Sequence, residues 1–485
     1  MKKTFAIIGI LMLASCSGSN SSIPSITSYT LTNAGNGLYV LSEQWGIVTR
    51  IDMTTFSLTT YNVGNGADMI LGAGNNVVVL NPVQNAIYVI GNNFVKKSID
   101  INLNDMIVSP DNTHAVVYHN YIPGEEAEFN GILVFNTFSV VNLTTTTDDT
   151  ISLSIGGGAP QQVVFTPSGD RFVVISRNRC FIVNTSNPSN NNYIELWPNP
   201  SRVIIPDQVV ITPQGDIALI RTQQENAVYI INLLQSSIMN VFSENQPTQI
   251  ALYQDGNKGL IVDAGSNSVS VLTFSHNPVA VSEQTVGLLT PASAVATSFS
   301  CTGACSLSTA TYSALFYSPS SSSTNISYLR IKNDVISTTV FGDLIAPVQF
   351  IMFAPDEPEK ALILHGASYL SNAAYPMSVV NVDNQEVNYF YVKTVPSSLI
   401  FAKNQAGDEL VFMTLTSQNE LVYYDLSSGT TNYIKLPPLP DALGVSGNTL
   451  FVSHDQPLGF ISLLDINSFR LRFISGFNAY KLFDR

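Results

Sequence analysis

The sequence is poor in charge, in cysteine and in helical patterns. Charged residues make up 12% of the 485 residues, four residues are cysteine, and the formal net charge is −14. No basic run is present, which argues against partners such as nucleic acid and against adhesion to anionic lipid head groups. After residue 16, no apolar stretch approaches the ~20 residues that a membrane-spanning helix needs. The chain also contains no convincing amphipathic helix of three turns.

The residues that are abundant favour β-structure. The chain contains 25 Phe and 20 Tyr, and Val and Ile are frequent. Aromatic and β-branched side chains are enriched in strands, and most of the remaining polar residues are the uncharged Ser, Thr, Asn and Gln. We therefore predict an all-β protein.

Short turns rich in Pro, Gly, Asn and Asp recur about every 46 residues. Proline presets φ at such a reversal, and Gly, Asn and Asp tolerate positive φ. The ten turns begin at Leu31, Leu71, Val108, Phe165, Ile211, Leu252, Phe299, Phe353, Phe401 and Val445. A period in the forties with four short strands per repeat is the signature of a β-propeller. We predict a single propeller of four-stranded blades over residues 29–485, with ten blades by direct count and eight as the alternative.

Two ways of closing the ring are compatible with the sequence. The segment Ile26–Leu31 can pair with the last strand, or the tail Phe477–Phe483 can add a strand of its own. Closure matters because it removes the exposed sheet edges.

The third strand of several repeats has a common pattern, seen in Asn85–Ile90, Asn226–Asn232, Asn267–Leu272 and Glu420–Asp425. This pattern resembles the bacterial YVTN-type propeller repeats, whereas the Trp-Asp dipeptide of WD40 repeats is missing. The resemblance implies a YVTN/WD40-like propeller. The functions of that group are too varied to transfer.

The N-terminus predicts export. Met1-Lys2-Lys3 precedes an apolar run from Phe5 to Ala14, and Cys16 follows Leu-Ala-Ser. A run this short fits a secretory signal and not a membrane span. The segment resembles a bacterial lipoprotein signal, which implies removal of residues 1–15, lipidation of Cys16 and membrane attachment through it. An ordinary signal peptide with a chance cysteine is the alternative.

Residues 16–28 then form a polar, flexible tether. Ser17 follows the cysteine, and by resemblance to the sorting of enteric lipoproteins this implies the outer membrane. Whether the propeller faces the periplasm or the cell exterior stays open.

The other cysteines predict a disulfide and a core residue. Cys301 and Cys305 flank Thr-Gly-Ala, so outside the cytoplasm they can close a disulfide across a turn; two free thiols are the alternative. No second Cys or His cluster accompanies them as a metal site requires. Cys180 lies in an alternating apolar run and is expected to pack as a small hydrophobe.

Three histidines end second strands. His119, His365 and His454 fall in the third, eighth and tenth repeats, so the ring separates them beyond the reach of one ion. We expect exposed histidines at strand ends, and no metal site.

The loops between second and third strands vary in length, whereas the turns between first and second strands look uniformly tight. Function on rigid scaffolds tends to lie on variable loops. Aromatic side chains give contact area at low entropic cost, so the candidate binding residues are Trp45, Tyr121, Phe129, Tyr369 and Tyr375. The alternative is that these aromatics fold back onto the disc.

No motif for a cofactor, a catalytic metal or a nucleophilic serine is found. The favoured function is therefore a non-enzymatic, lipid-anchored scaffold of the cell envelope that binds a protein or a polysaccharide. The alternative is a lactonase-like or other hydrolase with its site at the central channel, because the YVTN-like group resembles some lactonases in fold.

Overall fold

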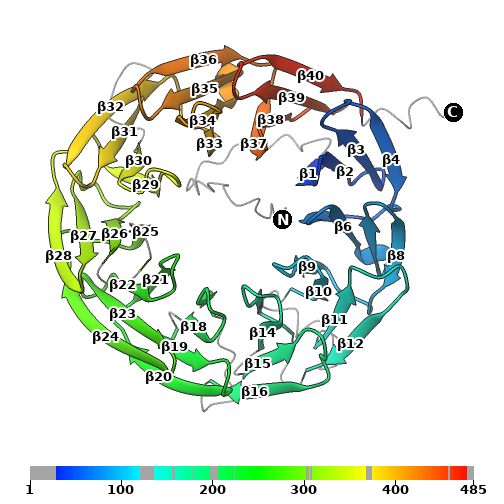
Figure 1. The fold of residues 1–485 in the computed structure, drawn as a ribbon, viewed down its shortest axis with the longest axis horizontal. Coiled ribbons are helices and arrows are strands. Elements are labelled where there is room, and N and C mark those ends of the chain that lie inside the picture. Colours follow the sequence, from blue (N-terminus) through cyan, green and yellow to red (C-terminus); the bar gives the residue numbers. More distant parts are fainter. Residues whose placement is uncertain are drawn as a thin grey trace, which may run out of the picture.

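The structure, a computed structural model, describes residues 29–120, 136–155, 159–176, 179–196, 206–222, 224–301, 305, 309–366, 374–456 and 459–477. In this part of the chain, forty strands form ten four-stranded antiparallel sheets, each built from four consecutive strands. The sheets stand as blades around a central axis, with the first strand of each blade innermost and the fourth outermost (Figure 1). The prediction of an all-β propeller with ten blades is confirmed.

The first five blades comprise β1 Tyr29–Ala34, β2 Gly37–Ser42, β3 Ile47–Asp52 and β4 Leu58–Asn62; β5 Met69–Ala73, β6 Asn76–Asn81, β7 Ala86–Ile90 and β8 Phe94–Ser98; β9 Asp105–Val108, β10 His114–Tyr118, β11 Thr137–Asn142 and β12 Thr150–Ser154; β13 Gln162–Phe165, β14 Arg171–Ser176, β15 Arg179–Asn184 and β16 Asn191–Glu195; β17 Gln208–Ile211, β18 Ile217–Thr222, β19 Ala227–Asn232 and β20 Ser237–Ser243.

The last five blades comprise β21 Pro247–Leu252, β22 Lys258–Asp263, β23 Ser268–His276 and β24 Val279–Gly287; β25 Ala294–Cys301, β26 Ala310–Tyr317, β27 Ile326–Lys332 and β28 Val335–Phe341; β29 Val348–Phe353, β30 Lys360–His365, β31 Tyr375–Asn381 and β32 Glu386–Val392; β33 Ser398–Lys403, β34 Glu409–Leu415, β35 Glu420–Asp425 and β36 Thr431–Lys435; β37 Pro440–Ser446, β38 Thr449–His454, β39 Phe460–Asp465 and β40 Leu471–Ser475.

Each of the ten predicted turns joins the first and second strands of one blade. In blade 5, for example, Thr212 and Gly215 close the turn with a backbone hydrogen bond of 2.8 Å, and Gly215 has a φ of +75°. A Cβ at such a φ is strained, so Gly is the natural residue there. The number of blades was therefore predicted correctly from the turn residues.

The core lies between the blades. The described residues form ten hydrophobic clusters, and each cluster joins the facing sides of two neighbouring blades. Second and third strands are the most buried, as in β18 and β19, where every residue is buried. A single blade cannot cover both its faces, so stacking around the ring supplies the burial that one sheet lacks.

The first predicted mode of ring closure, pairing of Ile26–Leu31 with the last strand, is wrong for the residues that the structure describes, whereas the tail Phe477–Phe483 lies almost wholly outside them. β1 pairs with β2 of its own blade, and β40 pairs with β39. The ring closes through side chains: Leu38 and Val40 of blade 1 pack against Phe451 and Ile461 of blade 10. Phe477 joins this cluster as a packed side chain, and residues 478–485 lie outside the described part.

Helical structure is confined to two single turns among the described residues, Pro82–Gln84 and Thr416–Gln418. Consistent with this, no described helix has the length and apolarity needed to traverse a bilayer. Cys180 is a free, fully buried cysteine in the cluster between blades 4 and 5, as predicted. Its burial raises the pKa of the thiol to about 12, so it stays protonated.

Candidate functional site

Two of the five predicted aromatic contact residues, Trp45 and Tyr375, lie in the part of the chain that the structure describes. Trp45 is half-buried in the turn between β2 and β3. Tyr375 is only 3% exposed and packs in the cluster between blades 8 and 9, so it serves the core. Tyr121, Phe129 and Tyr369 lie outside the described residues, as does the predicted lipidation site Cys16.

The strand-end histidines are buried, which corrects the expectation of exposure. His365 and His454 are each 0% exposed, and His119 is 6% exposed. In His365, Nδ1 contacts the Ala346 carbonyl at 2.8 Å and Nε2 contacts the Ser378 hydroxyl at 2.9 Å.

His454 repeats this arrangement with the Pro438 carbonyl at 3.0 Å and Ser462 at 2.7 Å. His119 contacts the Asn102 carbonyl at 2.8 Å. These imidazoles each tie the end of a second strand to the chain segment that enters the same blade. Their partners are local, so they are structural residues of the blades.

Carboxylates that lie in runs along the sequence are used within the propeller. Asp149 accepts a hydrogen bond of 2.7 Å from Lys97, whose side chain is fully buried. Glu357 pairs with Lys360, and Asp356 pairs with Lys403. Within the described ranges, no group of three or more His, Cys, Asp or Glu residues is arranged to hold a metal ion.

Three acidic residues from blades 1 to 3, Glu43, Asp68 and Asp105, form a cluster. Burial, followed by the charges of Glu43 and Asp105, raises the pKa of Asp68 to about 6. The Asp105 carboxylate accepts a hydrogen bond from Asn120 at 2.5 Å. The surrounding protein reduces the hydration of the Asp68 carboxyl, but the residue as a whole remains exposed, so water still screens the charges and the cluster has little energetic weight.

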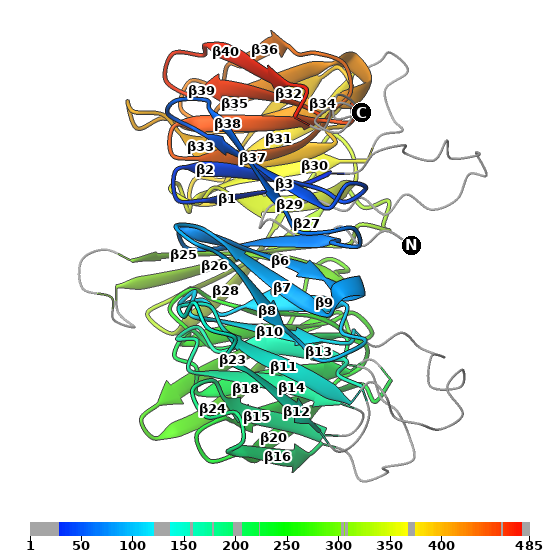
Figure 2. The ribbon, with the colours of Figure 1, turned by 90° about the vertical axis from the view of Figure 1, so that its right-hand side faces the viewer.

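The turns between first and second strands are not uniformly tight, contrary to the sequence-based expectation. In blade 7, β25 ends at Cys301 and β26 begins at Ala310, and each of these strands has eight residues. The hairpin extends beyond the disc on the face that carries the strand 1–2 turns (Figure 2). Cys301 and Cys305 form the predicted disulfide at its tip, with a Cα–Cα distance of 5.6 Å.

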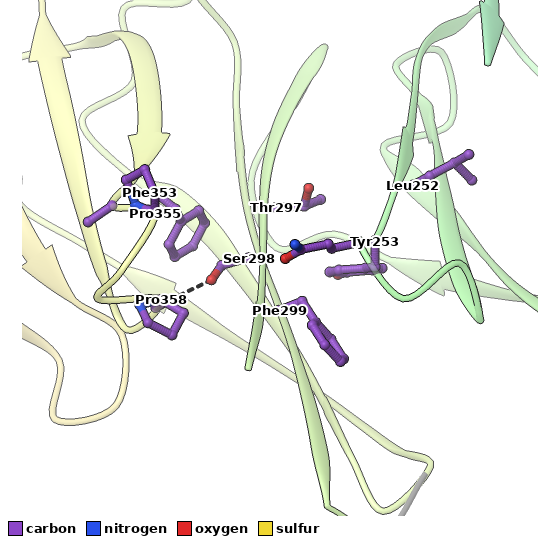
Figure 3. Close-up of a pocket in the computed structure, with 10 residues that line it drawn as sticks. Leu252, Tyr253, Thr297, Ser298, Phe299, Phe353, Pro355 and Pro358 are labelled. Carbon is purple, nitrogen blue, oxygen red and sulfur yellow. Dashed lines mark hydrogen bonds between the residues drawn. The ribbon is translucent and has the colours of Figure 1, made fainter. Parts of the chain in front are cut away.

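A slot opens along β25 at the base of this hairpin (Figure 3). Its volume is about 250 Å³. Thr297, Ser298 and Phe299 of β25 lie between two turns that form the walls. One wall is the β21–β22 turn with Leu252, Tyr253 and Gln254, and the other is the β29–β30 turn with Phe353, Ala354, Pro355 and Pro358.

Hydrogen bonds and ring contacts hold the slot in shape. The Ser298 hydroxyl donates to the Pro358 carbonyl at 2.7 Å, which ties β25 to the β29–β30 turn. On the other side, the Tyr312 ring lies 5.0 Å from the Tyr253 ring and 5.3 Å from the Phe299 ring. The Tyr312 hydroxyl donates to Asp255 at 2.6 Å. Burial and that carboxylate raise the pKa of Tyr312, so the donor is permanent at physiological pH.

The chemistry of the slot suits an uncharged guest. None of its ten lining residues carries a charge. They offer apolar and aromatic side chains, the exposed amide of Gln254 and the hydroxyls of Tyr253, Thr297 and Ser298. Sites for drug-sized ligands usually span roughly 300–1,000 Å³. This slot is smaller, with room for one or two side chains.

Only a weak signal for this site is present in the sequence. The slot joins residues from three repeats, and their proximity depends on the angle between blades. One usable feature was the Cys301–Cys305 pair, which marks an enlarged turn in a repeat whose other turns are short. The local turn at Phe353, with Pro355 and Pro358, also differs from the usual Pro-Gly-Asp pattern.

The comparisons with known proteins find distant structural likenesses. No known family model matches the sequence, and no curated protein is similar to it at the level of sequence. A eukaryotic initiation factor aligns at 11% identity over 84% of this chain and 97% of that chain, with a TM-score of 0.48. Dihydro-heme d1 dehydrogenase NirN aligns at 11% identity over 92% and 74%, with a TM-score of 0.42. Hydrazine synthase from Kuenenia stuttgartiensis aligns at 10% over 64% and 96%, with a TM-score of 0.36. Likenesses at this level carry no argument about function.

Proposed function

We propose that this chain is a non-enzymatic binding scaffold of the bacterial cell envelope, held to a membrane by lipid on Cys16. The observation that carries the binding role is the slot along β25. Its lining comes from three different blades, and the hydrogen bond from Ser298 to Pro358 holds two of them together. A disulfide closes the hairpin above it. A scaffold with pre-formed contact surface loses little entropy when a partner binds.

The lining favours a protein partner over a polysaccharide. Phe299 and Pro355 present apolar surface, and aromatic anchors that become buried dominate the energetics of protein–protein contacts. Recognition of a sugar polymer requires many polar groups around each ring. In this slot the Ser298 hydroxyl is already bonded to the Pro358 carbonyl and Tyr253 is buried, which leaves the Thr297 hydroxyl and the Gln254 amide.

Site-specific photo-crosslinking in the native cell tests the binding role. A photoreactive amino acid at Gln254, which is exposed on the slot wall, is compared with the same group at Gln44 in the β2–β3 turn of the opposite face. We expect a discrete protein adduct from Gln254 and none from Gln44. Adducts from Gln44 alone, or from neither position, contradict the proposal.

The anchor has its own test. Radiolabelled palmitate is supplied to cells that produce the wild type or the Cys16→Ala variant. We expect label and membrane fractionation in the wild type, and neither in the variant. Equal labelling of both proteins removes the anchor and leaves the binding role untouched.

A further inference from the structure

The inner edge of β25 has backbone groups without partners. Gln249 of the preceding blade donates to the Val295 carbonyl at 3.2 Å and accepts from the Val295 N–H at 2.8 Å. Val295 therefore directs its backbone groups away from β26. Because alternate residues of a strand face opposite edges, Thr297 and Phe299 direct theirs to the same free edge. In the described part of the chain, no group bonds them there.

This edge lacks the usual protection against strand pairing. Natural edge strands carry charges, prolines or bulges that block addition of another strand. The neighbouring inner strands show such devices: register breaks interrupt β21 after Pro247 and β29 after Val348. β25 pairs with β26 through eight residues without a break, and its sequence AVATSFSC has neither charge nor proline.

The free edge and the slot coincide. Thr297 and Phe299 supply both the unpaired backbone groups and part of the slot lining, and Figure 3 shows β25 running between the two wall turns. A segment that bonds to this edge runs along the slot and places alternate side chains toward the walls. Main-chain hydrogen bonds and side-chain pockets together are the basis of recognition by strand addition.

We propose that β25 binds an extended peptide segment of the partner as an added strand, with an apolar side chain of that segment in the slot. This inference rests on the proposed binding function and adds the chemistry of the ligand. The net charge of −14 favours a segment with basic flanks, because complementary charge speeds encounter.

The test uses linear twelve-residue random peptides displayed on phage, selected against the full chain in detergent. Enriched peptides are synthesised with a fluorophore, and their dissociation constants are measured by anisotropy. Each backbone amide of the best peptide is then methylated in turn. Strand addition predicts an alternating pattern, in which every second methyl group weakens binding about tenfold or more and the others leave it unchanged.

The protein side has a matched pair of variants. Thr297→Pro removes one N–H at the free edge, where proline is tolerated because no ladder bond is lost. Ile211→Pro makes the same change at the equivalent position of blade 5, whose neighbour Thr212 bonds to β18. We expect about a tenfold loss of peptide affinity in Thr297→Pro and none in Ile211→Pro. Gln254→Trp, which fills the slot from an exposed wall position, tests the same site if the proline variant fails to fold.

The outcomes separate the two proposals. A flat methylation scan, equal affinity in all variants, or no enriched peptide overturns strand addition. If the Gln254 photo-crosslink still captures a partner in that case, the binding scaffold stands and only its mode of recognition is wrong. Absence of any adduct overturns the proposed function itself.

Discussion

Gln208 on the innermost strand of blade 5 binds both backbone groups of Ile250 on the innermost strand of blade 6. Its side-chain amide donates to the Ile250 carbonyl at 2.8 Å and accepts from the Ile250 N–H at 2.7 Å. Gln249 repeats this bridge to Val295 of blade 7. A primary amide has the donor and acceptor of a peptide group, so each glutamine stands in for a missing ladder pair between inner strands.

The first prediction concerns the Gln208→Glu variant. A carboxylate keeps the acceptor for the Ile250 N–H but loses the donor, and it sets negative charge against the Ile250 carbonyl. We expect the free energy of unfolding at pH 7 to fall by about 1–3 kcal/mol, as for a buried polar group left unpaired.

The loss should shrink at pH 4, because a protonated carboxyl donates again. The carbonyl raises the folded-state pKa of the new carboxyl above its unfolded value, so its contribution is present at low pH and lost as pH rises. Urea unfolding followed by circular dichroism measures this, with Gln235→Glu at an exposed turn as the control. Equal losses in the two variants contradict the bridge.

The buried histidines predict acid sensitivity. The Pro438 carbonyl can only accept, so Nδ1 of His454 carries the proton and Nε2 accepts from the Ser462 hydroxyl. Burial lowers the pKa of His454, and the same holds for His365. The contribution of these histidines to the free energy of unfolding is therefore complete above their unfolded-state pKa of about 6.5, and it is lost as the pH falls below that value.

We expect the melting temperature of the wild type to fall between pH 7.5 and pH 5.5. His454→Gln should be less stable at pH 7.5, by about 1–3 kcal/mol for the lost hydrogen bonds, and should lose less on acidification. Thermal unfolding across this range measures both slopes. A variant that keeps the wild-type slope shows that His454 does not contribute to it.

The closure seam predicts where the ring opens. Phe451 is 2% exposed and packs between blades 10 and 1, which no shared sheet joins. We expect Phe451→Ala to cost about 3–5 kcal/mol, as other large core truncations do. Hydrogen exchange should accelerate in blades 1 and 10 and not elsewhere. Phe412→Ala, in the cluster between blades 9 and 10, is the control. Unchanged exchange in blade 1 contradicts closure by side-chain packing.

The cysteines predict a simple labelling pattern. Without reductant, alkylation of the folded protein should label none of Cys301, Cys305 and Cys180, because two form a disulfide and the third is buried. Reduction should expose the first two only, and Cys180 should react after unfolding. Because this disulfide closes a short loop, its reduction should lower the free energy of unfolding by at most about 2 kcal/mol. Intact-mass spectrometry counts the labels, and two labels without reductant contradict the disulfide.

The fold was predictable because turn chemistry is local. A chain reversal is determined within four or five residues by Pro, Gly, Asn and Asp. Each repeat can therefore be recognised from its own turn, wherever it lies in the chain. Pro167 with Gly169 in blade 4 and Pro213 with Gly215 in blade 5 are examples, and both glycines have positive φ. The ten blades follow from counting such turns.

The site was less predictable because it depends on contacts between repeats. Nothing local in Ala294–Cys301 shows that turns from blades 6 and 8 stand on either side of it. The exposure of the histidines was predicted wrongly for a similar reason, since Nδ1 of each ring contacts a backbone carbonyl, which leaves no mark on the sequence. The bridging glutamines are visible in the sequence, because Gln208 and Gln249 each lie three residues before the start of a predicted turn.

Hydrogen exchange with and without a slot-selected peptide shows whether β25 is the contact strand. If it is, exchange within residues 294–301 becomes slower when the peptide is bound, while exchange of residues 43–46 on the opposite face stays unchanged. Unchanged exchange across 294–301, or protection confined to the opposite face, contradicts binding at β25.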